Sequence, residues 1–258
     1  MLPRWCIPLA GLALAAGPLA AVPAAAASHP AGPTIHLIRP AMHGTAPMIA
    51  HGRPVNAQST NWSGYAAHGK TYNKISATWV EPTGHCTSSR TFSSFWVGLD
   101  GFNSGTVEQT GTEVDCVSGH ARYFGWYEMF PAFPVNFSNA VSPGDHFSGS
   151  VTFNGSGHFT LVLKDTTKGW SHTVHKTLNS AKRSSAEVIA EAPSSSGGVL
   201  PLTDFGTVHF GNSKVNGSAI GGFNPTKIVM VNSSGRAKDS VSALSGGTAF
   251  SVTWLHST

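Results

Sequence analysis

Carboxylates are scarce in this chain of 258 residues, which carries 12 Asp and Glu side chains and only 11% charged residues. Globular proteins average about 25% charged residues, so this shortage excludes a disordered polyelectrolyte, a long coiled coil and a charge-covered surface helix. The 16 Lys and Arg give a net charge of +4, but only Lys182 and Arg183 are adjacent. Because neither a basic patch nor a binding motif is present, we expect no nucleic-acid partner.

The first 80 residues contain no carboxylate at all, since the first acidic residue is Glu81. Arg4 precedes an Ala- and Leu-rich run that ends in three alanines at 25–27, the pattern of a secretory signal. No later stretch approaches 18 uncharged apolar residues, so no membrane span is expected once residues 1–27 are removed. The sequence therefore predicts a secreted, extracellular protein.

Residues 28–60 are rich in His, Pro and Ala and show no helical or strand period. Their four histidines have no tight ligand spacing and no Cys or carboxylate beside them, so we expect no metal site there. We interpret residues 28–60 as a pro-segment or linker. The remaining residues, 61–258, are interpreted as one domain.

From residue 61 onward, short runs of Thr, Val, Phe, Trp and Ser are broken by Gly, Asn and Pro, which is typical of an all-β domain. About 200 residues in a dozen strands favour one large antiparallel sandwich over two domains. The expected strands are residues 61–67, 74–81, 92–99, 106–116, 122–130, 146–153, 158–165, 171–177, 186–192, 203–210, 227–231 and 250–255.

Familiar nucleophile and metal motifs are missing: the chain has no G-x-S-x-G elbow, no H-E-x-x-H and no Walker loop. Cys6 would leave with the signal segment, and an oxidising compartment favours a disulfide between the two remaining cysteines, Cys86 and Cys116. That pairing disfavours a cysteine nucleophile.

Polar groups lie among large apolar ones in FWVGLDG (95–101), TVEQTGTEVD (106–115), WYEMFP (126–131) and AEVIAEAP (186–193). Side chains alternate along a strand, so Gln109 and Glu113 share a face, and so do Glu187 and Glu191. Carboxylates beside aromatics are typical of the lining of a sandwich cleft. A single Glu taken alone more often faces solvent.

These segments, with NWSGYA (61–66), ISATWVEP (75–82), VEQTG (107–111) and LTDFGTVHF (202–210), resemble in order and spacing the glutamic peptidases, or eqolisins. The resemblance covers residue 61 to the C-terminus. It implies a secreted acid endopeptidase made as a precursor and folded as a lectin-like (concanavalin A-like) sandwich of two curved antiparallel sheets. We expect it to act on polypeptides as a monomer, without a metal or organic cofactor.

The resemblance also assigns roles to individual residues. The catalytic dyad would be Gln109 and Glu191, with Glu187 as the alternative if the alignment in that strand is wrong. Val188, where an aromatic is common, and Glu113, where Asp is frequent, depart from the family pattern and leave the subsites open. The residues expected to line the substrate cleft or support the site are Trp96, Asp100, Glu113, Trp126 and Glu128.

Peptide hydrolysis suits this pair chemically. Glu191 as a carboxylate would take a proton from water and return it to the leaving nitrogen, while Gln109 would hold the water and donate to the oxyanion. A Glu with the usual pKa of about 4.3 stays partly ionised in mild acid, where a His base with a pKa of about 6.5 is protonated.

Two other functions remain open at this point. A glycoside hydrolase would use Glu113 and Glu128 as its carboxyl pair and Trp96 and Trp126 as sugar platforms, and it would survive the loss of Gln109. A non-catalytic carbohydrate-binding module would rest on the aromatic-rich strands alone and would hydrolyse nothing. Whichever function applies, a chain with few carboxylates is expected to form few ion pairs. Protonation at low pH then breaks few stabilising contacts, so the sequence predicts tolerance of acid.

Overall fold

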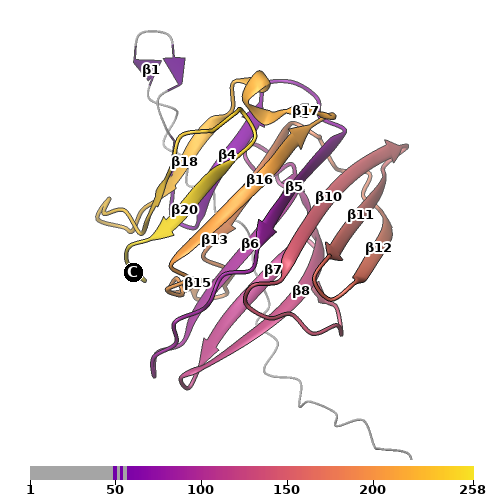
Figure 1. Cartoon of the computed structure of the whole chain (residues 1–258). Helices are drawn as coiled ribbons and strands as arrows, with labels where there is room; N and C mark the ends of the chain where they lie inside the picture. The colour runs from indigo at the N-terminus through magenta and orange to yellow at the C-terminus, as the bar shows by residue number, and fades with distance from the viewer. Residues whose placement is uncertain (1–48, 51–52, 55–56) are drawn as a thin grey trace, which may run out of the picture. The chain divides into compact units, whose positions relative to one another are not determined.

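The computed structural model describes residues 49–50, 53–54 and 57–258. In this part of the chain the regular structure is almost all β-strand, joined by one 3-10 turn, η1 (Ile220–Phe223). Two large sheets form a sandwich (Figure 1), so the predicted all-β sandwich is confirmed. The predicted signal segment 1–27, and most of the predicted pro-segment 28–60, lie outside the described residues.

The first sheet contains the strands on which most of the predicted site residues lie. Its order is β3 (Ala57–Ser59), β18 (Thr226–Met230), β4 (Trp62–His68), β13 (Ser185–Glu191), β6 (Thr91–Leu99), β7 (Val107–Val117), β8 (His120–Phe130) and β9 (Val135–Asn136). All pairs are antiparallel except β3 and β18, which run parallel. Because β3 belongs to this sheet, the sheet begins four residues before the domain start expected at residue 61.

The second sheet covers one face of the first. Its order is β12 (Trp170–Thr177), β11 (His158–Asp165), β10 (His146–Gly155), β5 (Lys74–Val80), β16 (Thr207–Val215), β20 (Phe250–Trp254) and β19 (Asp239–Val241), with β17 (Ser218–Ala219) paired to β16. Two short hairpins complete the described strands: β1 (Ile49–Ala50) with β2 (Arg53–Pro54), and β14 (Ser194–Ser195) with β15 (Gly198–Val199).

All twelve predicted strands are present, and for eleven the observed ends lie within two residues of the predicted ones. The exception is the strand expected at 203–210, which is β16 and starts only at Thr207. Leu202 and Asp204 instead form isolated bridges with Phe92 and His85, so this stretch of chain is held by other segments before it reaches β5.

Burial differs between the two sheets in a way that positions the site. In β5 only alternate residues, Ile75, Ala77 and Trp79, are buried, because one face of the second sheet contacts water. All nine residues of β6 are buried, so both of its faces are covered. On the face of the first sheet away from the sandwich core, a second apolar cluster includes Trp62 and Trp96. We call this face the outer face.

The predicted disulfide is confirmed. Cys86 and Cys116 are bonded, with their Cα atoms 5.2 Å apart. The bond joins the segment after β5 to the last residues of β7, the strand that carries Gln109. It thereby closes a loop that spans 30 residues of sequence.

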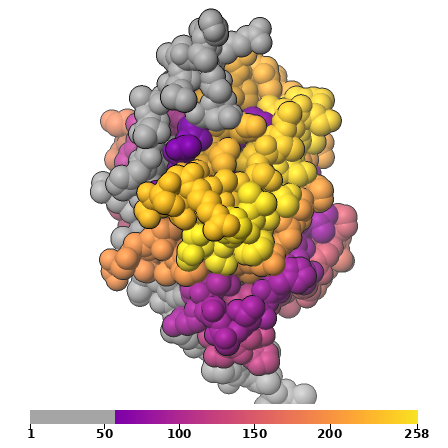
Figure 2. All heavy atoms as spheres, turned by 90° about the vertical axis from the view of Figure 1, so that its left-hand side faces the viewer, coloured from indigo at the N-terminus to yellow at the C-terminus, as the bar shows by residue number. Residues whose placement is uncertain are grey.

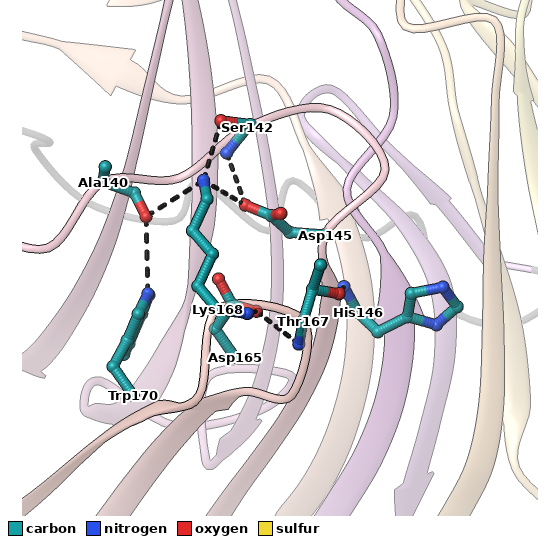
Figure 3. Close-up of polar contacts among 8 residues, drawn as sticks. All are labelled: Ala140, Ser142, Asp145, His146, Asp165, Thr167, Lys168 and Trp170. Atoms are coloured by element: carbon teal, nitrogen blue, oxygen red, sulfur yellow. Dashed lines mark hydrogen bonds and ion pairs between the residues drawn. The ribbon is translucent and has the colours of Figure 1, made fainter.

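The described residues contain one salt bridge, between Lys168 Nζ and Asp145 Oδ2 at 2.6 Å. The same ammonium donates to Ser142 Oγ at 2.7 Å and to the carbonyl of Ala140 at 3.3 Å (Figure 3). Asp165, at the end of β11, accepts the backbone N–H of Lys168 at 2.9 Å. This cluster holds the β11–β12 turn against the segment before β10, at the edge of the second sheet.

Candidate active site

The strand register gathers nearly all the predicted site residues on the outer face. Residues directly opposite one another in neighbouring strands project from the same face of a sheet, and in β13, β6, β7 and β8 the pairing forms three rows. The rows are Glu187, Gly98, Gln109 and Glu128; then Ile189, Trp96, Gly111 and Trp126; then Glu191, Ser94, Glu113 and Phe124. Gln109 and Glu191 therefore share a face, on the two strands that flank β6.

Glu191 has a hydrogen-bond donor on each carboxyl oxygen. Asn61 Nδ2 donates to Oε1 at 2.9 Å, and Trp96 Nε1 donates to Oε2 at 2.8 Å. Burial raises the pKa of this carboxyl to about 7, although the hydrogen bonds from Trp96 and Asn61 favour the ionised form and limit the rise. The ordinary value of about 4.3 used in the sequence reasoning is therefore too low for this buried position.

Two glycines make room for the Trp96 indole between Glu191 and Gln109. A Cβ at Gly111 would stand 2.2 Å from the carbonyl oxygen of Phe95 and 2.5 Å from the Cβ of Trp96. At Gly98 it would stand 2.9 Å from the Trp96 ring. Any larger residue at either position would push against Trp96 and disturb its hydrogen bond to Glu191.

Gln109 is oriented by Glu128 on the adjacent strand. Its Nε2 donates a short hydrogen bond to Glu128 Oε2, while its own Oε1 and the Glu128 Oε1 have no partner among the described residues. Burial raises the pKa of Glu128 to about 8; the Gln109 N–H opposes this rise and the charge of Glu191 adds to it. Glu128 is therefore a neutral acid at pH values below about 7, with one oxygen facing Gln109.

Glu113 forms the third acid of the outer face. It is 3% exposed, and its pKa lies well above the ordinary value because it is buried, with further contributions from Asp115, Glu191 and Glu128. Three buried carboxyls thus lie close enough to interact electrostatically, and Glu191 is the one with a hydrogen-bond donor on each oxygen, which favours its ionised form.

Asp100 is the predicted site residue that lies outside the three rows. Its carboxylate accepts the backbone N–H groups of Lys182, Arg183 and Ser184 at 2.6–2.8 Å. Its side chain also accepts the hydroxyl of Ser104. Asp100 is fully buried, so it fixes the chain immediately ahead of β13; its role in supporting the site stays a prediction.

Glu187 and Glu191 share a face of β13 but have different surroundings. Glu187 is fully buried, and burial raises its pKa well above the ordinary value, as do the charges of Asp100 and Glu108. Both of its carboxyl oxygens lack a hydrogen-bond partner among the described residues. It therefore lies beside Asp100, at the opposite end of β13 from Asn61 and Glu191.

Asn61 and Ser59 are site residues that the sequence reasoning missed. Ser59 Oγ accepts the backbone N–H of Asn61 at 3.3 Å and that of Trp62 at 3.1 Å, and it donates to Asn61 Oδ1 at 3.1 Å. Ser59 thus holds the Asn61 amide with its Nδ2 toward Glu191. The motif NWSGYA contains Asn61, but nothing in it identifies a partner 130 residues away.

The site is built from oxygen and nitrogen atoms of the chain itself. Within the part of the chain that the structure describes, no three His, Cys, Asp or Glu side chains come together as a metal site. No helix in that part is long and apolar enough to cross a bilayer.

Two further buried groups on the outer face, Ser94 Oγ and Trp126 Nε1, lack a hydrogen-bond partner among the described residues, as Gln109 Oε1 does.

Comparison with known sequences places the chain in a family. The model of the Peptidase A4 family matches residues 60–254. Aspergillopepsin-2 from Aspergillus niger is 31% identical to the chain over 132 residues, which are 48% of this chain and 47% of that protein. The chain therefore matches about half the length of this curated relative.

Solved structures agree with this placement. Scytalido-glutamic peptidase, solved with a transition state analog inhibitor, is 25% identical, with a TM-score of 0.67 over 76% of this chain and 98% of its own. Aspergilloglutamic peptidase from Aspergillus niger is 26% identical, with a TM-score of 0.57 over 64% and 99%. With a family model that spans most of its length, the chain belongs to the Peptidase A4 family, the glutamic peptidases or eqolisins, as the resemblance of its motifs predicted.

Proposed function

We propose that this protein is an endopeptidase of mildly acidic solution that hydrolyses polypeptides with a Gln109–Glu191 dyad. One observation carries the assignment. Glu191, with a donor on each oxygen, shares the outer face with Gln109, whose amide oxygen has no partner among the described residues. Membership of a peptidase family favours this reading of the face over a glycoside hydrolase or a carbohydrate-binding module.

The roles of the two residues follow from their atoms. An amide carries two N–H donors and one carbonyl acceptor. In Gln109 one N–H is held by Glu128, which leaves the second N–H for the oxyanion and Oε1 for a hydrogen of the attacking water. Glu191 then takes the proton from this water and returns it to the departing nitrogen. Trp96 and Asn61 are positioning residues, since they hold the Glu191 carboxylate.

The pKa of Glu191 sets the lower pH limit of this mechanism. Each pH unit below the pKa lowers the fraction of the carboxylate form about tenfold. Water and substrate in the site would add donors to the ionised carboxylate, so we expect the kinetic pKa to lie between the ordinary value of about 4.3 and the value of about 7 set by burial.

The protein purified after expression of the whole chain, with any processing it undergoes, tests the proposed activity directly. We expect it to cleave acid-denatured casein at pH 4–6 at internal bonds, and to do so equally in the presence of EDTA. New peptide N-termini, detected by mass spectrometry, are the measurement. Loss of activity with EDTA, or cleavage of polysaccharide but not protein, would remove the proposal. Export and removal of residues 1–27 and 28–60 stay predictions, which N-terminal sequencing of the active protein checks.

Replacing Asn61 with leucine is expected to move the acidic limb of kcat/KM to higher pH by about one unit. A hydrogen bond to a charged group contributes about 1.5–3 kcal/mol, and 1.36 kcal/mol corresponds to one pKa unit. Without the Asn61 donor the ionised form of Glu191 is less stable, so its pKa rises and activity falls most at low pH. Asn154→Leu, at an exposed position in β10, is the control. An unshifted limb in a folded Asn61→Leu variant would contradict the positioning role.

A further inference from the structure

A cavity of about 770 Å³ lies beyond the end of β13. It is bordered by the β14–β15 hairpin, the turn that follows β18, and the residues after β20. Figure 2 faces this end of the first sheet, where orange and yellow segments from the last third of the chain lie side by side. The proposed mechanism leaves this cavity unused.

The cavity is lined by a cation that forms no hydrogen bond or salt bridge with the described chain. Lys238 is 4% exposed and lines the cavity, yet its ammonium makes no hydrogen bond or salt bridge within the described chain. The neighbouring Asp239 interacts electrostatically with Lys238, but its Oδ1 accepts the Ser63 hydroxyl and it forms no salt bridge with the ammonium. The ammonium itself contacts the solvent of the cavity, so an acceptor that enters the cavity can reach it.

Other lining groups favour an anion as that acceptor. Arg236, exposed at the rim, bonds through Nη2 to the ring of His256, and its other guanidinium N–H groups have no partner within the described chain. Ser194 Oγ is buried and has no partner there either. No Asp or Glu side chain is among the lining residues. Two cations and a hydroxyl group thus line this space together with Thr258, whose terminal carboxylate forms no salt bridge with either cation.

The cavity begins close to the proposed dyad. Thr60, which lines it, precedes Asn61, the donor to Glu191. Ser194 follows Glu191 by three residues, and the backbone N–H of Ala192 donates to the Asn61 carbonyl at 2.8 Å. Since consecutive Cα atoms are about 3.8 Å apart, Ser194 and Glu191 are separated by at most about 11 Å. The side of the cavity at Ser194 is thus within about three residues of extended peptide from Glu191.

We propose that this cavity is a subsite that binds a carboxylate of the substrate peptide between Lys238 and Arg236, within about three residues of the scissile bond. The inference rests on the proposed peptidase function. The carboxylate belongs either to an Asp or Glu side chain or to the C-terminus of a short peptide. Both would meet the same two cations, so substrates must distinguish them.

Matched peptides at pH 5.5 test the subsite. One set exchanges Asp for Asn at each position within three residues of the cleaved bond, and a second exchanges a free C-terminus for an amide. We expect the wild-type protein to prefer the charged member at one position by about tenfold in kcat/KM, mainly through KM, the factor supplied by one charge-assisted hydrogen bond. A preference for Asp over Asn in the first set would show that the cavity binds an acidic side chain. A preference for the free C-terminus in the second set would show that it binds a terminal carboxylate.

Lys238→Met keeps the volume of the side chain and removes its charge, so it should reduce this preference to near one. Lys164→Met, at an exposed position in β11 of the second sheet, is the control and should retain the full preference. If Lys238→Met does not fold, Arg236→Gln at the exposed rim should reduce the preference severalfold. No preference in the wild type, or an unchanged preference in folded Lys238→Met or Arg236→Gln, would overturn the proposal.

Equilibrium binding separates this inference from the proposed function. If the wild-type protein cleaves none of the peptides, the peptidase proposal fails, and binding of the same Asp and Asn peptides is measured by fluorescence anisotropy. Tighter binding of the charged member, lost in Lys238→Met, would still support a carboxylate site in the cavity. Equal affinities for the two peptides would exclude it.

Discussion

Glu191→Gln is expected to lower kcat for peptide hydrolysis by about 10²–10⁴-fold, because the proposed general base and general acid are lost together. The fold should persist, since glutamine has nearly the same volume and its amide oxygen can still accept the Trp96 N–H. Cleavage of an internally quenched peptide at pH 5 gives kcat, and circular dichroism reports on the fold.

Gln109→Ala removes a different part of the proposed chemistry. Loss of one oxyanion donor costs about 10²–10³ in rate, and the water would also lose its acceptor, Gln109 Oε1. We expect kcat to fall by at least this factor while KM changes little. A glycoside hydrolase built on Glu113 and Glu128 would retain activity toward its sugar substrate in this variant, so the variant separates the two functions.

Glu187→Gln is the matched control for both variants. Glu187 lies on the same strand and the same face as Glu191 and is also buried, but it is placed beside Asp100. Its replacement should leave kcat within a few-fold of the wild type. If Glu187→Gln were inactive while Glu191→Gln kept near wild-type activity, the dyad would have been assigned to the wrong glutamate.

The domain is expected to be stable at pH 4 and to lose stability as the pH rises to 8, with Tm falling by roughly 8–16 °C. A group whose pKa is raised by folding holds its proton in the folded state at pH values where the unfolded chain releases it. The unfolded state then binds fewer protons, so the free energy of unfolding decreases with pH. This stabilisation is complete below the unfolded pKa and is lost as the pH rises through the folded pKa.

The expected fall in Tm is that of a single strongly held proton, although several carboxyls have raised pKa values. Eight of the 12 carboxyls have raised pKa values, and burial is the largest cause in each. Glu81, which is 1% exposed, rises to about 8, and Glu108 to about 9. Between pH 4 and 8, one proton held this tightly costs about 4 kcal/mol, and 1 kcal/mol corresponds to about 2–4 °C in Tm for a domain of this size.

Differential scanning calorimetry from pH 3 to 9 measures this dependence. Glu81→Gln, remote from the outer face, should flatten the curve because one buried acid no longer ionises. Asp204→Asn, at a partly exposed position, is the control. A Tm that is constant or increases between pH 4 and 8 would contradict the expectation. If Tm falls between pH 4 and 8 as expected, the acid tolerance inferred from few ion pairs has a second cause, which is the protons that the buried carboxyls retain in the folded state.

Much of the fold could be predicted because β-strands leave a local signal. The alternation of Ile75, Ala77 and Trp79 is readable in the sequence, and Gly and Asn mark the breaks between strands. Strands of two residues, such as β9 and β14, are too short to show a period. The start of β16 was misplaced because Leu202 and Asp204 are held by Phe92 and His85, more than 100 residues away in sequence.

Only part of the candidate site could be predicted from the sequence. Side chains alternate between the two faces along a strand, so the sequence alone placed Gln109 and Glu113 on the same face of β7. The register between strands could not, and it is the register that brings Glu128 beside Gln109. The donors to Glu191 and the rise of its pKa depend on burial and on distant segments, which no local pattern records.

The position of β13 within the first sheet has a consequence for dynamics. The strand is hydrogen-bonded to β4 on one side and to β6 on the other, along nearly its whole length. Its amide protons should therefore exchange with solvent only through global opening, whereas functional segments are usually drawn from the locally least stable parts of a protein. Thermal inactivation should then coincide with cooperative unfolding, and any motion that admits substrate must come from the surrounding loops, with the strand that carries Glu191 remaining still.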